Sequence, residues 1–324
     1  MHRDPIFVVG MPRSGTKLLR SLLNRHPDIS IADIETDFFF HWVRRWDRYG
    51  DLSRHDRFLA FYREAVTLPY FTYRQESGRL IAPDAWYAAC TDFTLPDVFG
   101  VLLRHDTGAG EATRWGDKSP SYITRIEALH HYFPGARFVH IVRDVRDYCL
   151  SINKAWNKNI YRAAQRWFDD NRACIRQCAA IAPACALVTF EDLLSDTRTT
   201  MQRLCRFLGV DYHAQMTRLA ESSENLGAAR GYKTILAHNT GKYLTRMSLH
   251  QVGRIEAIAA PLLHALGYTC SRQAPARRLG RSWMRWYQLL DGLNLLRFER
   301  RVRGTADALA YCYRYYRSSG NRGY

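Results

Sequence analysis

The segment from Gly10 to Lys17 has residue types and spacing that could bind a phosphate group. Its two glycines, Gly10 and Gly15, have the spacing of a nucleotide-binding loop. An ATP or GTP site would continue with Lys and then Ser or Thr, whereas here Thr16 precedes Lys17. This inversion moves the phosphate lysine and the magnesium hydroxyl from their usual places, and Arg13 supplies a cation inside the loop instead. The segment therefore predicts an anion site unlike that of an ATP-binding protein.

A second pair of residues could bind a phosphate much later in the chain. Arg143 ends an apolar run, and Ser151 lies eight residues further on, about two helical turns away. A long guanidinium and a hydroxyl at this spacing could meet one phosphate. Alternatively, Arg143 pairs with Asp144 or Asp147, and Ser151 bonds its own helix backbone. The presence of the first segment favours phosphate binding.

Both segments follow apolar runs that predict buried strands. The run from Ile6 to Gly10 is suited to a strand covered on both faces, and the leucines after Lys17 give the next helix one apolar side. Further strands are predicted at 137–142 and 185–190, with helices at 144–156 and 161–181 between them. Strands separated by helices predict an α/β fold with a parallel sheet flanked by helices. Its carboxyl edge would gather the loop after Gly10, Arg143 and Glu191.

The rest of the chain is harder to interpret from its sequence. An aromatic stretch from Phe38 to Trp42 precedes a region up to about residue 113 that we expect to be irregular, with Pro69, Pro83 and Pro96 as breaks. Such a region between core elements often forms a substrate side or a lid. Helical spacing returns at 122–133 and again at 248–266.

GMPRSGTKLL together with FVHIVRDVRDYCLS resembles the sulfotransferases that use 3′-phosphoadenosine 5′-phosphosulfate (PAPS), of the bacterial type. The resemblance implies a P-loop-like parallel sheet and a sulfotransferase domain over residues 1–270, with a basic, helical extension over 271–324. It also implies which residues contact the donor. The first motif contributes Arg13, Ser14, Gly15, Thr16 and Lys17. The second motif contributes Arg143 and Ser151, and a late loop contributes Lys242. An exposed surface lysine is the alternative for Lys242. Phe190 stands where the family commonly has Tyr, so it could stack near the adenine or pack in the core.

The same resemblance implies the catalytic residues. Arg13 aligns with the family's catalytic cation, and Lys118, in WGDKSP, with the lysine that reaches the departing oxygen; a surface ion pair with Asp117 or Glu111 is its alternative. HPDISIADIETDF is similar to a stretch of tyrosylprotein sulfotransferases, which makes Glu35 the candidate base. Asp33 and Asp37 remain competitors for that role.

The implied reaction is in-line transfer of a sulfuryl group to an acceptor hydroxyl, with cationic side chains in place of a metal. A glycan or glycolipid acceptor is favoured, because sugar rings and lipids pack well on aromatic residues such as those at 38–42. A small phenol and a peptide tyrosine are the other acceptors left open. Two alternatives stay open. One is a P-loop nucleotide kinase or other phosphotransferase; the other is a basic protein that binds nucleic acid or membranes without catalysis.

The positive charge of the chain lies mostly in its last part. The formal net charge of the 324 residues is +16, and residues 271–324 hold twelve arginines, no lysine and three acidic residues. The high isoelectric point thus arises mostly from residues 271–324, so nucleic-acid binding by the main domain is not expected. Helical spacing at 283–296 with flanking arginines suits contact with a membrane surface, or docking onto the main domain or a second subunit in a homodimer.

Apolar and cysteine content place two further limits. No apolar stretch approaches the roughly 18 residues of a membrane span, and the first is too short for a signal-peptide core. We therefore expect a cytoplasmic location. The eight cysteines lack a second Cys/His pair at metal spacing, which predicts reduced thiols and no metal site.

Overall fold

The computed structural model describes residues 4–110, 112–222, 230–271 and 275–304. Within them, a five-stranded sheet has the order β2-β3-β1-β4-β5, and every pair of neighbours is parallel. The strands are β1 (Ile6–Val9), β2 (Ile29–Ile31), β3 (Arg114–Asp117), β4 (Arg137–Val142) and β5 (Cys185–Thr189). The predicted α/β class is confirmed, as are the strands at β1, β4 and β5. The sequence did not predict β2 and β3, which are too short for a period to show.

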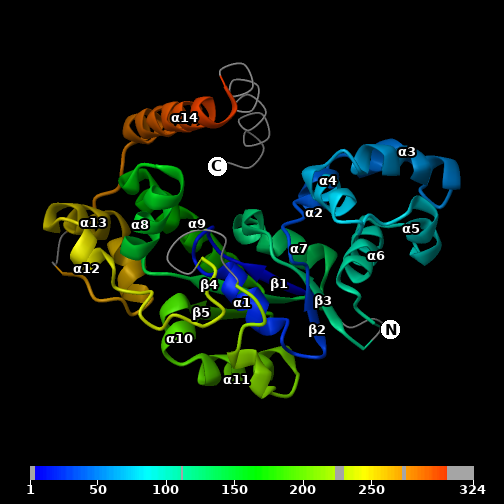
Figure 1. Cartoon of the computed structure of the whole chain (residues 1–324), viewed down its shortest axis with the longest axis horizontal. Helices are drawn as coiled ribbons and strands as arrows, with labels where there is room; N and C mark the ends of the chain where they lie inside the picture. The colour runs from blue at the N-terminus through cyan, green and yellow to red at the C-terminus, as the bar shows by residue number, and fades with distance from the viewer. Residues whose placement is uncertain (1–3, 111, 223–229, 272–274, 305–324) are drawn as a thin grey trace.

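Alternate residues of β1 enter two different cores. Ile6 and Val8 pack with α1 and α11 on one face, whereas Phe7 and Val9 join the larger core on the other. All four are fully buried, as predicted for a central strand. Helices therefore cover both faces of the sheet (Figure 1).

The helices form two groups, one on each face of the sheet. The helices on the first face are α1 (Thr16–Leu23), α10 (Phe190–Ser195) and α11 (Thr197–Leu208), with a 3₁₀ turn at Ala214–Thr217. The helices on the other side are α7 (Ile126–Tyr132), α8 (Val145–Trp156), α9 (Ile160–Ala180), α12 (Tyr243–Arg246) and α13 (Leu249–Ala265). The helix expected at 122–133 is in fact split, because a 3₁₀ turn at Pro120–Thr124 precedes α7.

The region up to residue 113 is helical, so the expectation of an irregular segment was wrong. Its elements are α2 (Phe38–Trp42), a 3₁₀ turn (Trp46–Tyr49), α3 (His55–Ala65), α4 (Pro69–Glu76), α5 (Pro83–Ala89) and α6 (Leu95–Thr107). Pro69, Pro83 and Pro96 each lie in the first turn of a helix. Proline is favoured there because the missing N–H would have no partner within the helix. These prolines therefore begin helices instead of breaking them.

The aromatic stretch at α2 is also different from the expectation. Phe38, Phe39 and Trp42 are fully buried, and Phe38 stacks on Phe99 with ring centroids 5.6 Å apart. Together with Trp86 they hold α2–α6 as one aromatic core beside β3. These three residues consequently form core and do not line an acceptor site.

The chain ends, within the described residues, in α14 (Arg281–Arg303), which lies beyond α8 at the edge of the molecule (Figure 1). The connection to it is anchored, since Arg277 N–H donates to the carbonyl of Ala257 and Leu279 N–H to Gln165. The division of the chain at residue 270 stays a prediction. Among the described residues, no helix has the length and apolarity that crossing a membrane requires.

Candidate active site

The carboxyl ends of all five strands meet at one edge of the sheet. The loop from Gly10 follows β1, Glu35 follows β2, Lys118 follows β3, and Arg143 follows β4; Phe190 follows β5. The strand order places β1 in the middle, next to the point where the chain changes direction across the sheet. Ligands of parallel sheets bind at such an edge. The strand pattern predicted the loop at Gly10, Arg143 and the end of β5 at this edge, and the family resemblance predicted Glu35 and Lys118 as site residues.

The backbone of the loop after β1 lies very close to the side chain of Phe190. Gly15 has φ +92°, and a Cβ on it would lie 2.4 Å from the ring of Phe190, so no other residue fits there. Arg13 also has a positive φ, 71°. The buried Ser14 hydroxyl has no hydrogen-bond partner among the described residues. Because an orphaned buried donor at a helix start is suited to an anion, the loop fits a phosphate group.

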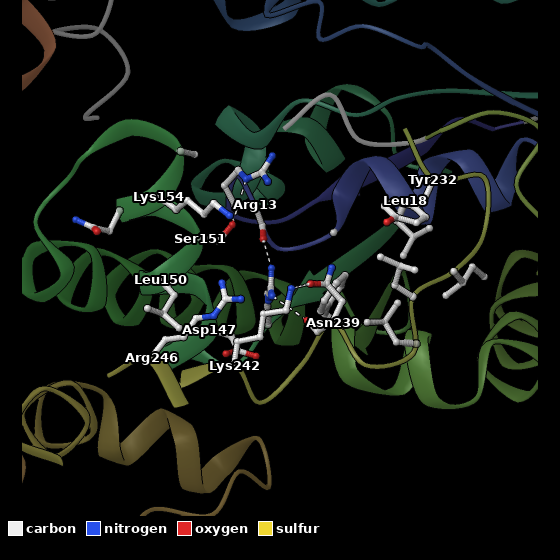
Figure 2. Close-up of a pocket in the computed structure, with 18 of the residues that line it drawn as sticks. Arg13, Leu18, Asp147, Leu150, Ser151, Lys154, Tyr232, Asn239, Lys242 and Arg246 are labelled. Atoms are coloured by element: carbon white, nitrogen blue, oxygen red, sulfur yellow. Dashed lines mark hydrogen bonds between the residues drawn. The ribbon is translucent and has the colours of Figure 1, made fainter. Parts of the chain in front are cut away.

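A cavity of about 470 Å³ opens beside this loop. Its residues divide into a basic end, where Arg13, Ser151 and Lys154 lie, and an opposite end with Leu18 and Tyr232 (Figure 2). Leu194 and Ile235 add apolar surface to the lining. A molecule with phosphates at one end and an aromatic base at the other would match this division.

Arg143 crosses the floor of the cavity in a nearly buried position. Its guanidinium donates to the carbonyl oxygens of Arg13 (3.2 Å) and Asn239 (3.1 Å), and it lies over the Phe190 ring. Burial lowers its pKa, while its Nε has no partner among the described residues. Asp144 instead binds Arg146 at 2.6 Å, so the alternative of an Arg143–Asp144 pair was wrong. Asp147 accepts the Tyr243 N–H, and its charge opposes the lowering of the Arg143 pKa.

Ser151 and Lys242 enter the same cavity. Arg13 Nε donates to Ser151 Oγ at 3.3 Å, so Ser151 faces the loop and not only its own helix. Lys242 donates to the side chain of Asn239, and burial, with the charges of Arg143 and Arg246, lowers its pKa. It is half-buried in the lining and is not a freely exposed lysine.

Lys118 and Glu35 form a second charged group outside the lining of this cavity. Lys118 Nζ donates to Glu35 Oε1 at 2.6 Å; the lysine side chain is 1% exposed and the glutamate 42%. Burial lowers the pKa of Lys118, Glu35 opposes the shift, and the charges of Arg20 and Lys17 add to it. Lys17 therefore lies near this pair. The expected alternative partner Asp117 does not bind Lys118, and Glu111 lies outside the described residues.

Asp117 connects the segments that carry this pair. Its Oδ2 accepts hydrogen bonds from Thr36 (2.8 Å), Tyr122 (2.8 Å) and Ser119 (3.1 Å). Thr36 is the neighbour of Glu35, and Ser119 follows Lys118. Complete burial raises the pKa of Asp117 to about 6. This carboxyl group thus fixes the spacing of the two charged side chains.

The competing acids have other partners. Asp33 binds Arg74 and Arg79; although partial burial raises its pKa, these cations lower it overall. Asp37 accepts a hydrogen bond from Ser121 Oγ at 2.7 Å. Of the three acids, Glu35 is the one that is paired with Lys118.

The structure therefore gathers Arg13, Gly15, Arg143, Ser151 and Lys242 around one cavity and sets Glu35 with Lys118 beside it. Among the lining residues that sequence reasoning missed, four are polar or aromatic residues that could contact a ligand: Lys154, Tyr232, Asn239 and Arg246. Lys154 could have been found, because it lies one helical turn after Ser151. The other three stand in a stretch without periodicity. In the described ranges, no three His, Cys, Asp or Glu side chains gather where they could hold a metal ion.

Comparison with known proteins gives consistent similarities. A model of the sulfotransferase family matches residues 5–214. A protein-tyrosine sulfotransferase 1 of Danio rerio is 25% identical over 81% of this chain and 72% of its own length. A putative protein-tyrosine sulfotransferase of Caenorhabditis briggsae is 23% identical over 83% of this chain and 91% of its own.

Solved structures agree on the fold. The sulfotransferase domain of the Synechococcus PCC 7002 olefin synthase superposes with a TM-score of 0.51, at 24% identity, over 80% of this chain and 96% of that one. A sulfotransferase domain from the curacin biosynthetic pathway gives a TM-score of 0.54 at 16% identity, over 83% and 99% of the two chains.

Proposed function

We propose that this chain, which belongs to the sulfotransferase family, transfers a sulfuryl group from PAPS to the phenolic hydroxyl of a tyrosine in a polypeptide. The family model covers well over half of the chain, so the chain is a sulfotransferase. The residue roles and the acceptor are the proposal. The cytoplasmic location, a homodimer and transfer without a metal stay predictions.

One observation carries the donor assignment: cations line a single cavity, beside a loop that holds an unpartnered buried hydroxyl. Ser14 Oγ and Arg143 Nε are buried without partners among the described residues, and Arg143 and Lys242 lie in the lining. Arg143 with Ser151 would hold one phosphate, while the loop of Arg13 to Lys17 would hold the other. The apolar end with Leu18 and Tyr232 suits the adenine.

The donor supplies the sulfuryl group, and the residues on both sides handle the proton and the charge. Glu35 accepts the proton of the acceptor hydroxyl as that oxygen bonds to sulfur. Arg13 and Lys118 stabilise the electron pair that the bridging phosphate oxygen keeps when its bond to sulfur breaks. Glu35 is half-exposed, so its carboxylate can meet an acceptor, and the buried Lys118 Nζ lies 2.6 Å from it.

The acceptor is proposed from chemistry and from relatives. Both sequence relatives named above are described as protein-tyrosine sulfotransferases. The preference for a glycan or glycolipid depended on an aromatic surface at 38–42, whose main members are buried in the core. A phenol, with a pKa of about 10, also yields its proton to a carboxylate more readily than a sugar hydroxyl does.

The first test measures calorimetric binding of adenosine 3′,5′-bisphosphate, with ATP plus magnesium as the comparison. Tight binding of the bisphosphate without metal is expected. Binding of ATP with magnesium alone would favour the phosphotransferase alternative and overturn the donor assignment.

A second test follows transfer of label from ³⁵S-labelled PAPS to tyrosine peptides. Peptides with Phe in place of Tyr are the matched control, and sugars are a separate arm. Label on sugars but not on tyrosine would overturn the acceptor while leaving the donor site intact.

A further inference from the structure

Helix α14 carries an exposed stripe of large apolar side chains. Trp283, Trp286, Leu289 and Leu293 are 55%, 53%, 63% and 49% exposed, and their spacing of three to four residues places them along one side of the helix. We propose that this side of α14 binds the surface of an anionic lipid membrane. The proposal does not depend on the enzymatic reaction, because it concerns a surface outside the cavity.

The side of α14 that is fixed to the protein begins next to Trp283, whose ring centroid lies 5.7 Å from that of Tyr287. Asp291 is buried, accepts from Arg162 at 2.8 Å and receives the Asn159 N–H at 2.7 Å. Asn294 donates to the carbonyl of Asn157, and the ring of Tyr287 lies beside that of Tyr161. These contacts set the rotation of the helix about its axis, so the apolar stripe is held outward.

The charges of α14 are divided in the same way. Its two acidic residues, Asp291 and Glu299, are buried. Of its cations whose burial is described, Arg281, Arg285, Arg297 and Arg300 are exposed, and the helical period places Arg297 and Arg300 on the side of the stripe. The outward side therefore combines tryptophan and leucine with positive charge, a combination that suits the headgroup level of an anionic bilayer.

Charge also argues for a membrane over the other partners. A second copy of this chain would bring the same arginines against each other, and like charges oppose pairing. A nucleic acid would take the arginines but would leave the two leucines in water. A helix of 23 residues that is anchored along one side lies flat on a bilayer, where tryptophan is favoured at the headgroup level.

The experiment is cosedimentation of the full chain with vesicles of phosphatidylcholine, with and without one-third phosphatidylglycerol, together with the emission of tryptophan. Binding to the anionic vesicles alone is expected, with weakening by salt. Changing Arg285, Arg297 and Arg300 to Gln should lower the partition coefficient about a hundredfold, since each surface arginine contributes about fivefold.

The variants Trp286→Asp and Leu293→Asp, made separately, test the apolar stripe. Each should abolish vesicle binding and leave the melting temperature unchanged, because the side chains are exposed. Leu187→Asp is the matched control, a leucine that is 40% exposed on β5.

Three results would overturn the proposal. One is equal binding to both kinds of vesicle, or to neither. Another is equal loss in the Leu187→Asp control. The third is a wild-type dimer in light scattering that Leu293→Asp separates into monomers, since this would make the stripe a subunit interface.

Discussion

The cations on the two sides of the active edge have different hydrogen-bond partners. Beside β1 and β4, Arg143 donates to the carbonyl oxygens of Arg13 and Asn239. Beside β2 and β3, Lys118 donates to the carboxylate of Glu35. Carbonyl groups hold a guanidinium in place without cancelling its charge, whereas a carboxylate neutralises an amine. The first side is thus suited to binding an anion, and the second side is suited to accepting a proton.

Burial strengthens this contrast. Both cations are nearly buried, and burial lowers the pKa of each. The charges of Asp147 and Glu191 offset part of the burial of Arg143, and an anionic ligand that binds its guanidinium would offset more. On the other side, binding an acceptor beside Glu35 would compete with a pair that already exists. We expect donor binding to depend on the first side and turnover on the second.

Glu35→Gln should have the largest effect. Gln keeps the size and can still meet Lys118, but it cannot take a proton, so turnover should fall by about a thousandfold. Affinity for the bisphosphate should change little, because Glu35 lies outside the cavity. Rates with saturating acceptor, and calorimetry, measure the two sides separately.

Asp37→Asn is the matched control, since Asp37 lies two residues away and binds Ser121. Loss of turnover in Asp37→Asn but not in Glu35→Gln would reassign the base. Loss of bisphosphate binding in Glu35→Gln would break the contrast between the two sides.

Asp117→Asn tests the buried group that holds Glu35 and Lys118. Folding raises the pKa of Asp117 from 3.8 to about 6. The folded state therefore keeps its proton over a range where the unfolded state loses it. The free energy of unfolding should fall as pH rises from about 4 to 6, by about 3 kcal/mol from this group. The Asn variant should lack that fall.

Denaturant melts of wild type and Asp117→Asn across pH 4 to 8 give this difference directly. Other buried acids contribute equally to both proteins and cancel in the comparison. A constant difference over the whole range would mean that Asp117 does not titrate in this window.

The sequence predicted the donor side better than the proton side. The loop at Gly10, and Arg143 with Ser151, follow strands whose long apolar runs are unmistakable. Lys118 and Glu35 follow β3 and β2, which are too short to leave a pattern, so a family resemblance was needed to place them. No local signal could show that Asp117 joins the two segments, because Thr36, the partner that links it to Glu35, lies 81 positions away in the chain.

For the aromatic residues at 38–42, the sequence predicted a binding surface where the structure has a core. Phe38, Phe39 and Trp42 suggested a binding surface, yet a cluster of large apolar rings is equally what a core needs. Only the partners Trp86 and Phe99, which are more than forty residues away, decide between them. Similarly, the prolines of α4, α5 and α6 begin helices, a role that depends on the helical residues after each proline.

Arg143→Ala should weaken bisphosphate binding tenfold to a hundredfold, on the basis of about 1.5–3 kcal/mol for hydrogen bonds to a charged group. It would also leave the carbonyl of Asn239 without this donor. Calorimetry measures the loss, and Arg203→Ala on α11, outside the cavity, is the control. An unchanged affinity would show that the carbonyl-held cation has no role in donor binding.

Lys242→Ala should have the smallest effect, a loss of bisphosphate affinity of about fivefold. Lys242 is half-buried and donates to Asn239, so its charge is partly screened and contributes about 1 kcal/mol. Lys233→Ala is the matched control, because Lys233 precedes it in the same stretch but is exposed and outside the lining. A loss in Lys242→Ala that equals that in Arg143→Ala would place the main anion contact at the late loop. Equal small losses of bisphosphate affinity in both lysine variants would mean that Lys242 acts only through long-range charge. The difference between the donor side and the proton side would then depend on Arg143 alone.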